Sequence, residues 1–118
     1  MKKLLILLIF SSTLVNPVFS QAQNIESFLF NLPDVIFKKI DTPNSFDLAY
    51  ELKIRQPLDH FDQSKGYFYQ KAFLSHKAFD RPIVINTAGY SKRKNNILEI
   101  TELLNANQIA VEHRFFGE

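Results

Sequence analysis

The sequence contains no cysteine and no tryptophan, and only three of its 118 residues are glycine. Without cysteine no disulfide can crosslink the chain, so its fold must rest on the burial of apolar side chains. Phenylalanine supplies much of that surface, because 12 residues are phenylalanine and 46% of the chain is hydrophobic. We therefore expect an ordered chain with an aromatic core, of a size that suits one small domain.

The chain also lacks a strong excess of charge. Its 14 basic residues exceed its 12 acidic residues by two, and Lys2 and Lys3 account for the difference. Removal of residues 1–20 would leave 12 residues of each sign. We find no basic stripe, no internal repeat and no low-complexity run, and we predict no nucleic-acid partner.

The first residues, MKKLLILLIFSSTLVNPVFSQAQ, have the parts of a secretory signal peptide. Lys2 and Lys3 precede an apolar run over residues 4–10, Pro17 breaks the helix, and cleavage is expected after Ser20. The run is shorter than the roughly 20 residues of a membrane span. We predict a signal peptide over residues 1–20, a secreted or periplasmic location, and no stable membrane insertion after cleavage. An uncleaved anchor or a buried helix is the alternative.

The segment 21–46 is expected to form an N-terminal arm. Residues 21–27 have no pattern and are expected to be flexible. Residues 28–41 are mostly apolar but are broken by Pro33, which favours an irregular path with a short strand at residues 35–37. Residues 42–45 (TPNS) are typical of a turn.

The segment 47–118 is expected to form part of an α/β domain, which begins with an antiparallel hairpin. Residues 47–57 alternate between apolar and polar side chains, as in a half-buried strand. A polar turn over residues 58–66 separates them from a second, aromatic strand at residues 67–76.

A βαβ unit is predicted next. Ile83, Val84 and Ile85 form a short continuous apolar run, which is typical of a strand buried on both faces of a parallel sheet. Apolar residues then recur at helical spacing (Ile97, Ile100, Leu103 and Leu104), and Asn105 and Asn107 are expected to end this helix. Residues 108–114 form a second buried strand. Because two parallel strands cannot cover both faces, we expect an incomplete sheet.

Several segments together resemble the N-terminal part of the S37 family of serine peptidases, the PS-10 peptidases. They are QPLDHFD (56–62), GYFYQKAFLSH (66–76), RPIVINTAGY (81–90) and ELLNANQIAVEHRFFGE (102–118). The S28 prolyl carboxypeptidase group shares the Asp-His-Phe and Glu-His-Arg-aromatic-aromatic-Gly patterns. The resemblance covers residues 28–118, and the ordered series of motifs makes it specific.

The resemblance implies a secreted tripeptidyl aminopeptidase with an α/β-hydrolase fold and a Ser-Asp-His triad. In that fold the nucleophile lies on a Gly-x-Ser-x-Gly turn. Glycine occurs here only at positions 66, 89 and 117, so this chain contains no such turn. The resemblance therefore places all three triad residues beyond Glu118, and the chain is expected to be an inactive fragment that needs no cofactor.

Two segments contain candidate site residues. In TAGY (87–90) the resemblance implies an oxyanion-hole loop, with Gly89 shaping the backbone and the Tyr90 amide as a donor; a plain tight turn is the alternative. In VEHRFFGE (111–118), Glu112 and Glu118 are candidates for binding the free amino terminus of a peptide substrate.

His113 could act as a general base. The structural alternative, which the resemblance favours for His113 and Arg114, pairs Arg114 with a carboxylate and makes Gly117 the turn.

Other polar clusters favour structural roles. In LDHFD (58–62), nothing supplies further ligands at metal spacing, so Asp59 and Asp62 are expected to accept backbone amides. SKRKNN (91–96) is expected to be a solvated loop, with substrate entry as the alternative. Ser75 and His76 adjoin in a strand, face opposite sides and cannot act as a nucleophile–base pair.

The sequence thus predicts the N-terminal fragment of a secreted serine peptidase that, as a whole enzyme, would release tripeptides from free N-termini. Two alternatives remain at this point. One is a secreted non-enzymatic remnant or binding module, and the other is a lipase or esterase of the same fold.

Overall fold

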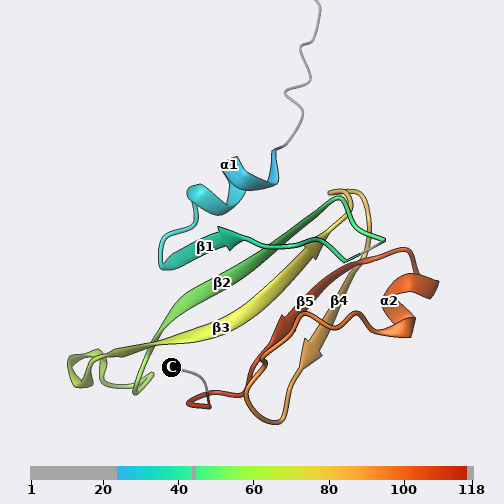
Figure 1. Ribbon diagram of the computed structural model, residues 1–118. Helices are drawn as coiled ribbons and strands as arrows, with labels where there is room; N and C mark the ends of the chain where they lie inside the picture. Colours follow the sequence, from blue (N-terminus) through green and yellow to red (C-terminus); the bar gives the residue numbers. More distant parts are fainter. Residues whose placement is uncertain (1–23, 44, 117–118) are drawn as a thin grey trace, which may run out of the picture.

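The computed structural model describes residues 24–43 and 45–116, in which five strands form one mixed sheet in the order β1-β2-β3-β5-β4 (Figure 1). The strands are β1 (Val35–Lys39), β2 (Leu48–Pro57), β3 (Tyr67–His76), β4 (Ile83–Thr87) and β5 (Asn107–Val111). The pairs β1–β2, β2–β3 and β3–β5 are antiparallel, and β4 runs parallel to β5. The predicted α/β class, with an antiparallel hairpin that leads into a βαβ unit, is confirmed.

The hairpin of β2 and β3 is the longest part of the sheet. The two strands pair along all ten residues, from Leu48 opposite His76 to Pro57 opposite Tyr67. Its tip holds a short 3-10 helix, η1 (Gln63–Lys65), and the tip closes at Gly66 with φ 99°. That backbone conformation favours glycine. The predicted alternation is confirmed, because Tyr50 and Leu52 lie in the core with Leu48 and Ile54 packed against them.

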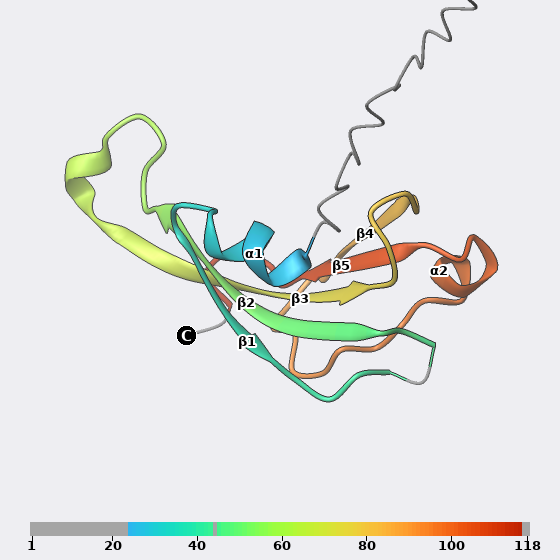
Figure 2. The ribbon, with the colours of Figure 1, turned by 90° about the horizontal axis from the view of Figure 1, so that it is seen from above.

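A helix that the sequence did not predict covers one face of the hairpin. This helix, α1 (Ile25–Phe30), buries Ile25 and Leu29 against Leu52 and Leu74, and Figure 2 shows it lying over the sheet. Asn24 caps it, since the Asn24 side chain accepts the Glu26 amide at 2.9 Å. Residues from 25 onward are therefore part of the packed structure, although a flexible segment was expected as far as residue 27.

The second helix, α2 (Glu99–Leu103), is shorter than predicted and is turned differently. It ends at Leu103, and the chain turns at Asn105, whose φ of 48° is the left-handed conformation that asparagine tolerates. Asn105 thus has its expected place after the helix, whereas Asn107, also expected there, is the first residue of β5. Thr101 is its one buried residue, whereas the predicted apolar face at Ile100, Leu103 and Leu104 is exposed. The expectation that this face packs on the sheet is wrong for the described residues, because the polar Thr101–Gln108 contact sets the helix orientation.

The strand β4 lies at the edge of the sheet. Ile83 and Ile85 share a face and are 58% and 68% exposed. The sequence predicted a strand buried on both faces, and this expectation is wrong here, because no strand or helix within residues 24–43 and 45–116 covers that side. The sheet is therefore open at β4, which agrees with the expected incomplete sheet.

Neither helix of the described residues is long and apolar enough to cross a membrane. The predicted signal peptide, residues 1–20, lies outside the described residues.

Candidate functional site

The loop that follows β4 lines a shallow, open hollow at the carboxyl end of the parallel strand pair. The hollow has a volume of about 460 Å³ and is lined by the loop itself: Ala88, Gly89, Tyr90, Ser91, Lys92, Arg93, Lys94 and Asn96. Both candidate oxyanion-hole residues, Gly89 and Tyr90, therefore lie at one concave surface. Clefts at the carboxyl ends of parallel strands are where α/β proteins commonly bind ligands.

Two backbone hydrogen bonds tie this loop to the end of β5. The Ala88 amide donates to the Val111 carbonyl at 2.8 Å, and the His113 amide donates to the Tyr90 carbonyl at 3.1 Å. The amides of Gly89 and Tyr90 themselves donate to no other residue that the structure describes. They are thus available donors beside the hollow.

The conformation of Gly89 does not itself require glycine. Its φ lies outside the left-handed region, and a Cβ built on it would meet no atom within 4 Å. A side chain at this position would project into open space. Any requirement for glycine here must come from something that approaches the loop closely rather than from the described residues themselves.

The candidate Glu112 lies directly after β5 and is 2% exposed. Its Oε1 accepts the Lys71 amide of β3 at 3.1 Å, and its Oε2 accepts the Lys92 amide of the loop at 3.3 Å. A buried carboxylate is stable only when its oxygens are satisfied, and here backbone amides satisfy them. Glu112 therefore joins β3, β5 and the loop around the hollow.

The residues after Glu112 turn sharply and carry aromatic rings. Phe115 has φ 68°, which is unusual for a bulky side chain, and its ring packs on Phe68 with 4.7 Å between centroids. Phe116 meets Tyr90 and His113 edge to face at 5.5 and 5.2 Å. This cluster closes one side of the loop.

His113 itself is exposed, and its Nδ1 lies 3.0 Å from the Arg114 carbonyl oxygen. No carboxylate among the described residues bonds to its ring. The structural interpretation of His113 therefore fits this geometry better than a general base oriented by an acid.

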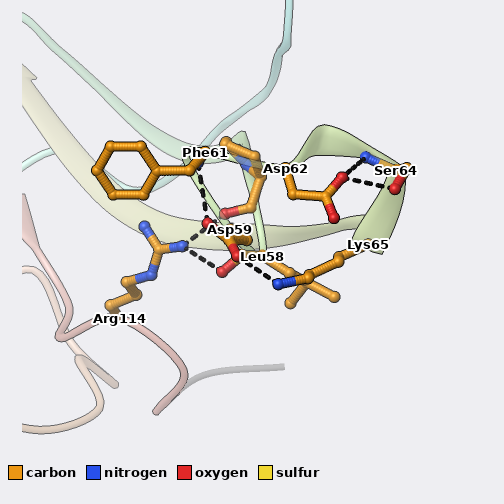
Figure 3. A network of polar contacts seen from close by, with 8 residues as sticks. Leu58, Asp59, Phe61, Asp62, Ser64, Lys65 and Arg114 are labelled. Carbon is orange, nitrogen blue, oxygen red and sulfur yellow. Dashed lines mark hydrogen bonds and ion pairs between the residues drawn. The ribbon is translucent and has the colours of Figure 1, made fainter.

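Arg114 joins the end of β5 to the hairpin tip, as Figure 3 shows in part. Its Nη2 donates to the carbonyls of Pro57 and Leu58 at 2.5 and 3.0 Å, and its Nη1 lies 2.7 Å from the His60 Nε2. The expected pairing of Arg114 with a carboxylate is wrong within the described residues, since its partners there are carbonyl oxygens and an imidazole. The planar guanidinium fits this forked set of acceptors.

The hairpin tip has the structure that its sequence predicted. Asp59 accepts the Phe61 amide at 2.9 Å, and Asp62 accepts the Ser64 amide at 3.1 Å (Figure 3). The Lys65 Nζ donates a hydrogen bond to Asp59 at 2.6 Å, and this bond is the main reason that the pKa of the Asp59 carboxyl lies below its usual value. The hydrogen bond from the Phe61 amide lowers this pKa further. Within the described residues no group of side chains is arranged to hold a metal ion.

A buried polar network that sequence reasoning did not find holds the segment between the loop and α2. The Gln108 Oε1 accepts the Leu98 amide at 2.9 Å and the Thr101 hydroxyl at 2.7 Å, and its Nε2 donates to the Asn96 carbonyl at 2.9 Å. A glutamine inside a predicted buried strand was the available signal, because a buried amide needs partners.

Ser75 lies on the same face of the sheet as this network, and its hydroxyl accepts a hydrogen bond from the side-chain Nδ2 of Asn95 at 2.8 Å. His76 faces the other way, into the core beneath α1, so the two cannot act together, as predicted.

The structure thus brings Gly89, Tyr90 and Glu112 together around one loop. Glu118, the remaining candidate for the substrate amino terminus, and Gly117, the expected turn residue, lie outside the described residues.

Comparison with known proteins adds an independent line of evidence. The family model described as PS-10 peptidase S37 matches residues 19–118. Prolyl tri/tetrapeptidyl aminopeptidase from Streptomyces mobaraensis is 44% identical over 63 residues, which span 52% of this chain and 13% of that relative. No solved structure matches the chain.

Proposed function

This chain belongs to the S37 family of peptidases, and we propose that it is the N-terminal part of a secreted serine aminopeptidase with an α/β-hydrolase fold. The whole enzyme would release tripeptides from peptides with a free amino terminus. The chain spans only 13% of the length of its aminopeptidase relative, and it contains no Gly-x-Ser-x-Gly turn. On this proposal the fragment alone is inactive, and other parts of the enzyme supply the triad.

The observation that carries the proposal is the loop after β4. In acyl transfer, amide N–H groups must face the oxygen that becomes negative in the transition state. The Gly89 and Tyr90 amides are free of other described partners, lie beside a hollow and follow a parallel strand. This is the chain position at which an α/β hydrolase contributes one oxyanion-hole donor.

The open edge of β4 also fits the proposal. Further strands of an α/β-hydrolase sheet would pair with that edge, and the helices that connect them would cover Ile83 and Ile85, which are exposed here. The nucleophile of such an enzyme follows a strand of the same sheet, so it would approach the loop from this side.

We assign different parts to the two candidate glutamates. Both oxygens of Glu112 accept backbone amides, so in this proposal Glu112 holds the loop in place. Binding of the substrate ammonium group then rests on Glu118 and on acids elsewhere in the enzyme.

The test is a pair of variants in the protein expressed from its whole reading frame. Gly89→Ala and Gly89→Val should leave the melting temperature unchanged, because a Cβ at Gly89 meets nothing. If the loop faces the reacting carbonyl, the added side chain should obstruct the approach of that carbonyl to the Tyr90 amide. We then expect kcat for a tripeptidyl reporter to fall by about 10²-fold, the scale of a lost oxyanion contact. Ser27→Ala, at an exposed position of α1 outside the hollow, is the control.

Four further measurements separate the alternatives. A reporter with a blocked amino terminus should not be cleaved, and a serine-directed inhibitor should abolish activity. A purified 21–118 polypeptide should be inactive. Hydrolysis of acyl esters but not of peptides would indicate a lipase or esterase. Unchanged kcat and KM in the Gly89 variants would show that the loop is not part of the active site.

A further inference from the structure

The open hollow lined by residues 88–94 and Asn96 is strongly basic, and we propose that it binds a carboxylate group of the peptide substrate. This inference rests on the proposed peptidase function and adds a preference for acidic substrates. Three of the residues that line the hollow are Lys92, Arg93 and Lys94. No aspartate or glutamate occurs between Ile83 and Leu98.

The three cations are not neutralised by ion pairs within the described residues. The ion pairs of that part of the chain involve Arg55, Lys65 and Arg81 instead. Arg93 and Lys94 are exposed and Lys92 is half-buried. Cations clustered on a concave surface without acidic partners produce a local positive potential, which attracts anions.

Among the residues that the structure describes, the acid that bonds to the loop is Glu112, and it does not compete for these side chains. The carboxylate of Glu112 is 2% exposed and accepts the backbone amides of Lys71 and Lys92. Its contact with Lys92 is therefore to the main chain, and the Lys92 ammonium group remains available.

The size and donors of the hollow suit a carboxylate on a peptide. About 460 Å³ accommodates a side chain of the size of glutamate together with water. The guanidinium of Arg93 can bind both oxygens of a carboxylate, whereas Lys92 and Lys94 act as point charges.

A peptide offers this group from two sources, an acidic side chain and its own carboxyl terminus. A substrate series separates them. Otherwise identical hexapeptides carry either Glu or Gln immediately after the cleaved bond, and each is made with a free and with an amidated carboxyl terminus. KM and kcat are measured for all four by mass spectrometry, with the protein expressed from its whole reading frame.

If the hollow binds one of these two carboxylates, we expect peptides that carry it to have a KM about three- to tenfold lower than peptides that lack it. We expect kcat to be similar. That range corresponds to a few partly exposed charge pairs. The advantage should shrink at about 0.5 M salt, because the cations are solvent-accessible. The Arg93→Gln/Lys94→Gln variant should abolish it, whereas the control Lys38→Gln/Lys39→Gln, a pair of exposed lysines on β1, should retain it.

The outcomes distinguish this inference from the function on which it rests. Cleavage of all four peptides with equal KM overturns the inference and leaves the peptidase function standing. If no peptide is cleaved, the proposed function fails, and calorimetric titration with the Glu and Gln peptides decides the inference. Tighter binding of the carboxylate peptide that depends on Arg93 and Lys94 supports a carboxylate site, and equal or absent binding overturns it.

Discussion

The carboxylate of Glu112 accepts the backbone amide of Lys92 at 3.3 Å, across the gap between the end of β5 and the loop after β4. The same carboxylate accepts the amide of Lys71 in β3 at 3.1 Å. One buried acid thus joins three segments that are distant in the sequence. The position of the loop that forms the candidate site depends on it.

Glu112→Gln should destabilise the protein by about 1–3 kcal/mol, because an amide NH₂ group would then face one of the two backbone N–H donors and leave it unsatisfied. Denaturant unfolding measures the loss, and hydrogen exchange should be faster at the Lys92 amide. Glu99→Gln, on the exposed side of α2, is the control and should change neither. Equal stability of the two variants would contradict the role assigned to Glu112.

Arg114→Lys should loosen the hairpin tip. Lysine cannot reach the carbonyls of Pro57 and Leu58 together with His60, nor stack on the rings of Phe68 and Phe115 as the guanidinium does. We expect a loss of about 1–2 kcal/mol in unfolding free energy and faster hydrogen exchange over residues 58–66.

Arg81→Lys is the matched change at an exposed arginine, whose ion pair with Asp80 is 4.0 Å long. It should have little effect. If hydrogen exchange over residues 58–66 is unaltered in Arg114→Lys, contacts other than those of Arg114 hold the hairpin tip in place.

The stability of the fold should fall as the pH drops below about 6.5. His76 lies 8% exposed beside an apolar cavity of about 350 Å³ beneath α1. Burial holds the pKa of His76 below 6.5, and the nearby charge of Asp47 opposes this only in part. Between the folded pKa and 6.5 the unfolded chain binds more protons, so the unfolding free energy decreases with decreasing pH.

Substitution of His76 tests the source of this pH dependence. His76→Gln should remove this part of the dependence between pH 5 and 7, whereas the same change at the exposed His113 should preserve it. Thermal unfolding across that range is the measurement. A wild-type curve that is parallel to that of His76→Gln would refute the assignment.

The open edge of β4 should make an isolated 21–118 polypeptide self-associate. The strand β4 has no charged residue, and Ile83 and Ile85 expose apolar surface next to the unpaired backbone groups of the edge. Ile85→Lys should reduce association, as measured by sedimentation velocity. Phe61→Lys removes a fully exposed ring at the far hairpin tip and should not reduce it. A wild-type polypeptide that is monomeric and melts sharply would contradict the prediction.

Much of the secondary structure could be predicted because it depends on local patterns. The alternation in residues 47–57 places Tyr50 and Leu52 in the core, and the spacing of strand, helix and strand predicts the parallel pair β4–β5. The helix α1 was missed because six residues are too few for a helical period to stand out. Asn24, as a capping residue before Ile25, was the available signal.

The sequence by itself determined the family, the strands and the absence of a Gly-x-Ser-x-Gly turn, because these depend on residue order and short periods. Only the tertiary structure decided that Arg114 binds the hairpin tip and that Glu112 binds the loop after β4. It also decided that Gln108, and not the apolar positions of α2, fixes that helix. These contacts join segments 7 to 57 residues apart, and their partners are largely backbone groups, which carry no mark in the sequence.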